Sequence, residues 1–396
     1  MEKLTKIRFK VWAIIVTVIL FTALIFILVI NNYHSTTDNN FAQINQNNFT
    51  ITPEQSQGMI STTLTPTPVP PKLQYNAWIP NWASSAGLSS VKENPWLFNS
   101  LSPTWYEVNE DGTLKTTFPG NRSEIITYTK TNKIKLIPTI AMFDHEILSK
   151  VLESPENFKR HIQSIVDISK LYDGIDLDYE STKLADKELY FEMLTQLNSE
   201  FSQTNKMLVV TVIAKWGDDI VYPSLPETRQ VQDWKRIGEL ASEVRIMAYD
   251  YTFSKSYFPG PIAPLGWTRD ILNYAKTKIK PEKIVLGIHL YSYEWSIAAA
   301  DQYDFIIDMS ANKTGDTTAN SYTYSQIKSL LQAHSGQTSE FDNETIFRYE
   351  LNGQKKTLVY QTPEQLKTRI NLAKEFGIKG VVFWRLGDEA DLLKNI

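Results

Sequence analysis

The chain has 396 residues, a formal net charge of −4 and 42% apolar residues, which is enough to bury the core of one large domain or two ordinary ones. The weak acidic excess gives no reason to expect a nucleic-acid partner, because proteins that bind nucleic acid carry a basic surface. The chain has no cysteine, which excludes disulfides, thiolate metal sites and a cysteine nucleophile.

The N-terminus has the pattern of a membrane anchor. Residues 1–10 carry four basic residues, and the uncharged, apolar run Val11–Ile30 follows them. Twenty residues span about 30 Å as a helix, which matches the hydrocarbon core of a bilayer. No Ala-x-Ala site follows Ile30, so we expect a single-pass signal anchor rather than a cleaved leader. The basic flank should stay in the cytoplasm and leave the rest of the chain outside, at the cell surface.

Residues 31–72 are rich in Asn, Thr, Gln and Ser and end in the proline-rich stretch Thr65–Pro71. The segment has no apolar periodicity from which to build a core. It is therefore predicted to be a disordered linker with a stiffer proline end, which tethers a domain at 73–396.

From residue 74 onward, short β-like runs alternate with helical patterns. The expected strands are Tyr75–Ile79, Phe98–Trp105, Ile134–Ile140, Gly174–Asp178, Leu208–Ile213, Val244–Ala248, Ile284–Ile288 and Gly380–Phe383. The expected helices lie near Arg122–Thr131, Pro155–Leu171, Asp186–Gln203, Gln230–Ala241, Thr268–Lys278 and Pro363–Phe376. Eight strands with helical patterns in most of the gaps between them predict an α/β fold, a closed (β/α)8 TIM barrel, rather than an open sheet.

One interval, residues 290–361, is too long for an ordinary connection between the seventh strand and the eighth helix. Ser321–Ala333 has a helical pattern, and two β-like runs, Thr345–Tyr349 and Lys356–Tyr360, flank the hairpin signal Asn352-Gly353. We expect a small α+β insertion that forms one wall of a cleft.

The fourth expected strand carries an unusual acidic pattern, Asp173-Gly-Ile-Asp-Leu-Asp-Tyr-Glu180. Because side chains alternate along a strand, Asp176, Asp178 and Glu180 share one face, and an apolar set lies opposite. In a barrel interior, at least one of these carboxyl groups must stay protonated. A solvated edge strand fits poorly between buried segments. Asp-x-Asp also occurs in cation sites, but the glycine precedes the acids here, unlike in a calcium loop.

These eight residues resemble the signature Asp-Gly-x-Asp-x-Asp-x-Glu of glycoside hydrolase family 18, the chitinase family. Met247-Ala-Tyr-Asp250, at the end of the sixth expected strand, resembles the Met-x-Tyr-Asp motif of that family. Trp384 ends the eighth strand, and a tryptophan at the same place in the family forms the floor of the subsite for the cleaved sugar. Tyr291 ends the seventh strand. Barrel enzymes place their catalytic residues at such strand ends.

The resemblance implies retaining, substrate-assisted hydrolysis of β-linked N-acetylglucosamine glycans. Glu180 would protonate the glycosidic oxygen while the acetamido carbonyl of the sugar attacks its own anomeric carbon. Asp178 would hold the acetamido N–H and share a proton with Asp176, and Tyr249 would donate to the acetamido oxygen. Asp250, Trp384, Tyr291 and Met247 are the expected substrate-binding residues.

Asp173 has the opposite strand parity, so we expect it to be structural together with Gly174. The resemblance implies no metal and no other cofactor. The expected partners are a polysaccharide containing N-acetylglucosamine and the membrane through Val11–Ile30, with the protein a monomer. Five tryptophans lie near strand ends, where some could line sugar subsites, but the core is the expected place for each of them, namely Trp78, Trp82, Trp105, Trp216 and Trp267.

Four further stretches are similar to the bacterial branch of spore-cortex and peptidoglycan N-acetylglucosaminidases. They are Trp78–Trp82, Ser102–Tyr106, Gly260–Leu265 and Gly380–Gly387. The third strand departs from common chitinases, because Ile137–Met142 replaces their Ser-x-Gly-Gly, and this disfavours crystalline chitin as the substrate. Two alternatives remain: a lectin-like barrel that binds glycans without cutting them, and a metal-dependent glycosyltransferase that uses Asp176 and Asp178.

Overall fold

The computed structural model describes residues 72–396, apart from 219, 221, 223, 257, 298–318, 390 and 395. They belong to a compact unit, Val69–Ile396. The predicted anchor at 11–30 and the predicted linker, up to residue 71, lie outside the described residues. Within the described part of the chain, none of the helices has the length and apolar character needed to cross a bilayer.

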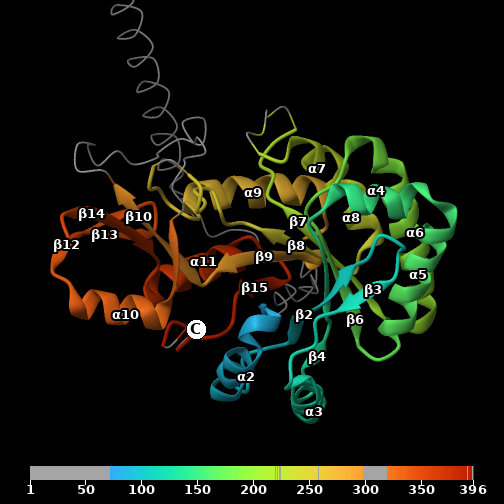
Figure 1. Cartoon of the computed structure of the whole chain (residues 1–396), viewed down its shortest axis with the longest axis horizontal. Coiled ribbons are helices and arrows are strands. Elements are labelled where there is room, and N and C mark those ends of the chain that lie inside the picture. The colour runs from blue at the N-terminus through green and yellow to red at the C-terminus, as the bar shows by residue number, and fades with distance from the viewer. Residues whose placement is uncertain are drawn as a thin grey trace, which may run out of the picture. The chain divides into compact units, whose positions relative to one another are not determined.

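Eight parallel strands close into a barrel, seen near the centre of Figure 1. They are β1 (Gln74–Ile79), β2 (Ser100–Val108), β5 (Thr139–Met142), β6 (Gly174–Tyr179), β7 (Met207–Ile213), β8 (Glu243–Met247), β9 (Ile284–His289) and β15 (Gly380–Trp384). The barrel closes because β1 pairs with both β2 and β15. A short antiparallel strand, β3 (Leu114–Thr116), extends β2. The predicted barrel and its eight strands are confirmed.

The third strand is the one that differs from the prediction. A separate two-residue strand, β4 (Lys135–Leu136), pairs with the start of β2, and β5 resumes only at Thr139. Pro138 lies in the gap and has no N–H for a ladder hydrogen bond, although its carbonyl still accepts from Asp176 N–H at 3.0 Å. The expected single run Ile134–Ile140 is therefore two short strands, and it extends further, to Met142.

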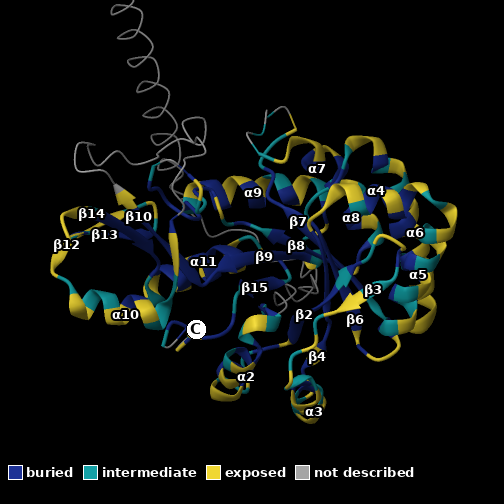
Figure 2. Ribbon diagram, viewed as in Figure 1, coloured by how far each residue is buried: buried dark blue, intermediate teal, exposed yellow. Residues whose placement is uncertain are grey.

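Helices surround the barrel, with their exposed faces outward and the strands buried (Figure 2). They are α2 (Ser84–Glu93), α3 (Arg122–Asn132), α4 (His145–Glu153), α5 (Pro155–Ser169), α6 (Lys187–Thr204), α7 (Pro226–Val231), α8 (Trp234–Leu240), α9 (Leu265–Lys278) and α11 (Pro363–Glu375). Short 3-10 turns lie at Asn81–Ala83, Leu184–Asp186 and Pro281–Lys283. The predicted helix Gln230–Ala241 is wrong as one unit, because Asp233 caps a new helix there through the N–H groups of Lys235 and Arg236.

Two predicted helix starts are confirmed. The hydroxyl of Ser154 accepts from Asn157 N–H, and Pro155 occupies the first turn of α5. The hydroxyl of Thr362 accepts from Gln365 N–H while the Gln365 side chain accepts from Thr362 N–H, which completes a capping box. Both caps fix the residue at which a helix begins.

The interval after β9 forms a second sheet in the order β11-β10-β14-β13-β12, with one helix against it. Its elements are β10 (Tyr291–Ile297), β11 (Asn320–Thr323), α10 (Tyr324–Ala333), β12 (Gly336–Phe341), β13 (Glu344–Leu351) and β14 (Gln354–Tyr360). Asn352 and Gly353 both have positive φ, so the predicted hairpin is confirmed. The predicted helix Ser321–Ala333 begins only at Tyr324, because Thr323 caps it and the preceding residues pair with β10.

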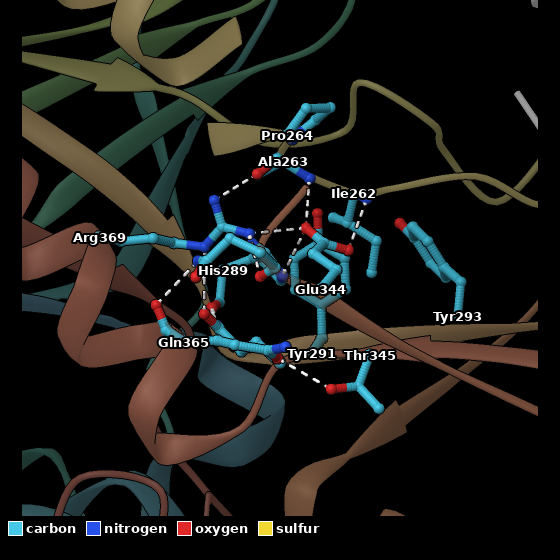
Figure 3. Close-up of polar contacts among 12 residues, drawn as sticks. Ile262, Ala263, Pro264, His289, Tyr291, Tyr293, Glu344, Thr345, Gln365 and Arg369 are labelled. Carbon is cyan, nitrogen blue, oxygen red and sulfur yellow. Dashed lines mark hydrogen bonds and ion pairs between the residues drawn. The ribbon is translucent and has the colours of Figure 1, made fainter. Parts of the chain in front are cut away.

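A buried ion pair joins this insertion to the barrel (Figure 3). Glu344, at the start of β13, accepts from Ile262 N–H at 2.9 Å, from Ala263 N–H at 2.7 Å and from the Arg369 guanidinium at 2.9 Å. His289, at the end of β9, lies 3.8 Å from Glu344, and burial, together with the nearby charge of Arg369, lowers its pKa well below the usual value. The insertion is therefore fixed to the loop after β8 and to α11.

Candidate active site

Strand β6 carries the acidic motif into the barrel. Asp176 and Asp178 are buried inside, and Glu180 follows the end of the strand at the mouth, half-buried. Ile175, Leu177 and Tyr179, on the other face, pack in the core between the barrel and the helices. The structure thus brings the three predicted inward carboxyl groups to one end of one strand.

The beginning of β6 is held by close backbone contact. An added Cβ at Gly174 would lie 2.3 Å from the carbonyl oxygen of Met207 on β7, so only glycine allows this approach. The carboxylate of Asp173 accepts from Leu136 N–H at 2.8 Å, which ties β6 to β4. Both residues lie at the end of the barrel opposite Glu180, in keeping with the structural role predicted for them.

Asp176 is held by four donors from four different strands. Its Oδ2 accepts from Trp78 Nε1–H at 2.8 Å, from the Thr139 hydroxyl at 3.1 Å and from the Arg245 guanidinium at 3.0 Å. Its Oδ1 accepts from the Thr211 hydroxyl at 2.8 Å. A buried carboxylate with a buried cation and three further donors is compensated. The proton that it would share with Asp178 stays a prediction.

Asp178 is in the opposite situation. Its Oδ1 is buried and has no hydrogen-bond partner among the described residues. Burial, then the charges of Glu180 and Asp176, raise its pKa well above the ordinary value. The protonated carboxyl is therefore favoured in the free protein, and the unpaired oxygen can accept a hydrogen bond from a bound group.

Glu180 has an environment suited to a general acid. Burial, followed by the negative charge of Asp250, raises the pKa of Glu180 to about 7. Asp250 lies on the loop after β8, so the second cause of this rise comes from a different strand of the barrel than Glu180. A carboxyl with this pKa holds its proton through mildly acidic pH.

The end of β8 lies across the mouth from Glu180. Met247, Tyr249 and Asp250 line a cavity of about 280 Å³ together with Glu180, and Trp267 lies at its wall. Burial, then the charges of Asp178 and Glu180, raise the pKa of Tyr249 well above its usual value, so its hydroxyl remains a donor. The predicted residues of the Met-x-Tyr-Asp motif thus lie together with the acidic strand.

Asp250 joins this cavity to a second hollow of about 500 Å³ beside the insertion, which Tyr291, Tyr293, Trp384 and Trp82 line. Tyr291 donates a hydrogen bond to Asp250, and Tyr293 donates one at 3.2 Å. Asp250 is exposed as a residue, but its carboxyl lies between the two tyrosine hydroxyls and the lining of both hollows. Burial raises its pKa to about 6, against the lowering effect of the two tyrosine hydroxyls. The two hollows adjoin at Asp250, and we refer to them together as the cleft.

Two residues of the site were missed from the sequence. Arg245 is buried and contacts both Asp176 and Glu243, and its position two residues before Met247 gives it the inward parity of β8. The inward parity of Arg245 was the signal from which its place inside the barrel could have been predicted. Trp82 was expected in the core, which is wrong, because it is 71% exposed and lines the cleft. Trp78 and Trp105 are buried, as expected.

Among the described residues, no group of three or more His, Cys, Asp or Glu side chains is placed to hold a metal ion. The Trp384 ring, at the end of β15, meets the Trp78 ring edge-on, with 6.0 Å between centroids. Trp78 in turn contacts Asp176. The floor of the cleft and the acidic strand are therefore packed as one unit.

Comparison with known proteins gives the same family as the motif. Residues 77–389 match the family described as glycosyl hydrolases family 18. The uncharacterized glycosylase YvbX of Bacillus subtilis (strain 168) is 24% identical over 319 residues, which cover 78% of this chain and 86% of that protein. The cortical fragment-lytic enzyme of Bacillus anthracis is 24% identical over 299 residues, which cover 74% of this chain and 66% of the enzyme.

Solved structures share the fold. The Bacillus cereus spore cortex-lytic enzyme SleL superposes with a TM-score of 0.69 at 22% identity, over 80% of this chain and 71% of that chain. A chitinase from Chromobacterium violaceum superposes with a TM-score of 0.69 at 19% identity, over 81% of this chain and 96% of that chain. The family match covers almost the whole barrel together with its insertion. This chain is therefore a glycosidase of glycosyl hydrolase family 18.

Proposed function

We propose that the protein hydrolyses β-linked N-acetylglucosamine glycans with retention of configuration, and that the substrate's own acetamido group is the nucleophile. The observation that carries this proposal is the buried, unpartnered Oδ1 of Asp178, which lies in the same cluster of charges as Glu180 and Tyr249. An acetamido N–H is a donor that would satisfy this oxygen.

Each role follows from an environment. Glu180, with its pKa raised to about 7, donates its proton to the glycosidic oxygen. Asp178 accepts the acetamido N–H and, once its proton passes to Asp176, with which it is predicted to share that proton, offsets the positive charge of the cyclised intermediate. Tyr249, whose raised pKa keeps its hydroxyl protonated, donates to the acetamido oxygen. Asp176 remains fixed by Arg245 and supports Asp178 from below.

The remaining cleft residues bind the sugar chain. Trp384 offers an apolar face beneath the cleaved sugar, and Tyr291 and Met247 form the walls. Asp250, held by Tyr291 and Tyr293, has an acceptor left for a sugar hydroxyl. No carboxylate other than those on β6 and Asp250 needs to act, which fits a mechanism without a protein nucleophile.

For the substrate, we favour cell-wall glycan over chitin. The support comes from the relatives named as cortical fragment-lytic enzymes and from the four stretches similar to the peptidoglycan branch. We further propose that Val11–Ile30 anchors the protein in the membrane and that the barrel acts outside it, at the cell surface, as a monomer. The uncharged length of that segment and its basic flank support this location.

The acid is tested by the variant Glu180→Gln in the full chain, with N-acetylglucosamine oligomers as substrate and products measured by mass spectrometry. We expect kcat to fall by at least about 100-fold, because a positioned general acid contributes that much or more, while oligomer binding persists. Glu192→Gln, a matched change on an exposed face of α6, should leave turnover unchanged.

A thiazoline mimic of the cyclised intermediate separates the mechanisms, and it should inhibit the wild-type protein competitively. Unchanged turnover in Glu180→Gln would remove this residue as the acid. Indifference to the thiazoline would count against acetamido participation. Tight oligomer binding by the wild-type protein without any hydrolysis would instead support the lectin-like alternative.

A further inference from the structure

The end of the barrel opposite the cleft carries a group of lysines. Parallel strands begin at this end, and the loops that lead into β1, β4, β6 and β7 meet there. Their lysines, together with one in the last turn of α3, are Lys72, Lys130, Lys133, Lys135, Lys170 and Lys206. Five of the six are exposed, and Lys206 is half-buried. We call these six residues the lysine face.

Backbone hydrogen bonds show that the loops of the lysine face lie side by side. Lys135 N–H donates to the carbonyl of Asn99, in the loop before β2, at 3.0 Å. Asp173 N–H donates to Leu136 O, and Met207 N–H donates to Asp173 O, each at 3.0 Å. The lysines from neighbouring strands therefore form one continuous surface rather than scattered single charges.

The surface is concave and its positive charge is poorly compensated. Five of the six lysines line a hollow of about 560 Å³, and Asp173 is the one carboxylate among its lining residues. That carboxylate accepts from Leu136 N–H and, in the part of the chain that the structure describes, forms no ion pair with these lysines, so it offsets at most one of their five charges. Of these five lysines, Lys170 alone forms an ion pair among the described residues, with Asp167 at 2.7 Å. The positive surface belongs to a chain whose net charge is −4, so it is a local concentration of charge.

Two large apolar side chains are exposed at the same end. Trp96, in the loop before β2, is 93% exposed, and Leu171, next to Lys170, is 69% exposed. A tryptophan and lysines that extend from one surface are the combination found at membrane interfaces, where the ring lies among the headgroups and the ammonium groups meet phosphates. A soluble polyanion would contact the lysines but would gain little from Trp96.

The covalent path of the chain favours the same partner. Residues 1–71 join the domain at Lys72, and the neighbouring Gln74 N–H donates to Lys379 O at 3.0 Å at this end of the barrel. A linker of the predicted length has a root-mean-square span of roughly 35–40 Å, so an anchored domain samples the membrane surface at high effective concentration.

We propose that the lysine face docks on the anionic phospholipid surface next to the predicted anchor. Docking at this end turns the cleft, which lies at the other end of the barrel, away from the membrane and toward the wall. The carboxylates of Asp250 and Asp388, which line the cleft, would be repelled by the same lipids, which reinforces this orientation. The inference rests on the proposed anchor but not on the proposed chemistry.

Site-specific labelling is direct, because the chain has no cysteine of its own. The full chain is reconstituted in vesicles that contain headgroup-quencher lipids, with a fluorophore on Thr131→Cys at the lysine face or on Lys255→Cys at the cleft end. With about a third phosphatidylglycerol and about 0.1 M salt, we expect quenching of the label at 131 and not of the label at 255. Phosphatidylcholine vesicles, or about 1 M salt, should abolish that quenching.

Each lysine should contribute about a fivefold factor to the ratio of docked to undocked domain. The triple variant Lys130→Gln, Lys133→Gln, Lys135→Gln should therefore lower that ratio by about 100-fold. The matched triple Lys159→Gln, Lys235→Gln, Lys367→Gln, exposed and away from this face, should keep docking intact. Hydrolysis of soluble oligomers should stay at the wild-type rate in both, so a failure of the catalytic proposal is detected separately.

Three outcomes would overturn docking on lipid. One is equal quenching of the label at 131 in neutral and anionic vesicles. A second is an equal loss in the two triple variants. The third is a chain that floats with anionic vesicles while its label at 131 stays unquenched, and that binds inorganic polyphosphate through Lys130, Lys133 and Lys135. That result would assign the surface to a soluble polyanion.

Discussion

Two residues apart on one strand, Asp176 and Asp178 have opposite surroundings. Asp176 receives four donors, including a buried guanidinium, and its charge is satisfied before any ligand arrives. Asp178 keeps an unpaired buried oxygen and a raised pKa. The free-energy cost of burying a carboxyl group is therefore compensated by hydrogen bonds at Asp176 and remains uncompensated at Asp178. That retained cost is what a bound acetamido group can relieve.

The pH dependence of catalysis should follow Glu180. Because its pKa is raised to about 7 and the acid must be protonated, kcat/KM should be high below that pH and fall as the pH rises through it. Asp250→Asn removes the negative charge that adds to the rise, so the alkaline limb should move to lower pH. Measurement is by pH profiles on an N-acetylglucosamine oligomer.

Asp388→Asn is the control for that shift, since Asp388 lines the same cleft but is not a cause of the raised pKa of Glu180. Its profile should coincide with that of the wild-type protein. An alkaline limb that stays in place or moves upward in Asp250→Asn would contradict the proposed coupling. A reduced kcat in that variant would not, because the position of the limb is independent of its height.

At the level of elements, a strand could be predicted from the sequence where its apolar and polar residues alternate regularly. Ile175, Leu177 and Tyr179 alternate with acids, and this pattern fixed both the strand and its faces. Strand β10 carried a comparable signal that was missed, since Tyr291, Tyr293 and Trp295 alternate with polar residues and are buried. Strand β12 offers no such signal, because Gly336–Phe341 is polar and exposed and is defined by its pairing with β13.

Long-range contacts set the remaining features. Arg245 donates to Asp176, which is 69 residues away in the sequence. Trp82 follows β1 closely, and its exposure depends on how the insertion and β15 shape the cleft around it. Strand parity can place a residue such as Arg245 inward, but its partners meet only in the closed barrel, so a single sequence does not identify them.

Gly174 should be the most sensitive position of β6. In Gly174→Ala the new methyl group would lie 2.3 Å from Met207 O, and strands β6 and β7 would have to separate. We expect the free energy of unfolding to fall by about 1–3 kcal/mol, measured by chemical denaturation, because overpacking has costs of that size. Gly120→Ala, where no atom lies within 4 Å, should change stability little. Equal stability of the two variants would show that the β6–β7 contact relaxes freely.

At the level of the whole molecule, the chain enters the barrel at one end and the acidic cleft opens at the other. This follows from parallel strands, because their starts and their ends lie on opposite faces. A predicted anchor before Lys72 therefore presents the catalytic end outward without any special hinge. The predicted linker at 31–72 has a composition that would allow the domain both to dock on the membrane and to reach away from it.

The anchor itself is open to a direct test. In cells that express the full chain, we expect the protein in the membrane fraction after an alkaline carbonate wash. Ile19→Arg with Leu24→Arg should release it, since each arginine near a helix centre costs about 2.5–3.5 kcal/mol of insertion free energy. The matched pair Asn45→Arg with Asn47→Arg, in the linker, should stay bound. A mature N-terminus between residues 31 and 40, found by N-terminal sequencing, would show instead that the apolar segment is a cleaved leader.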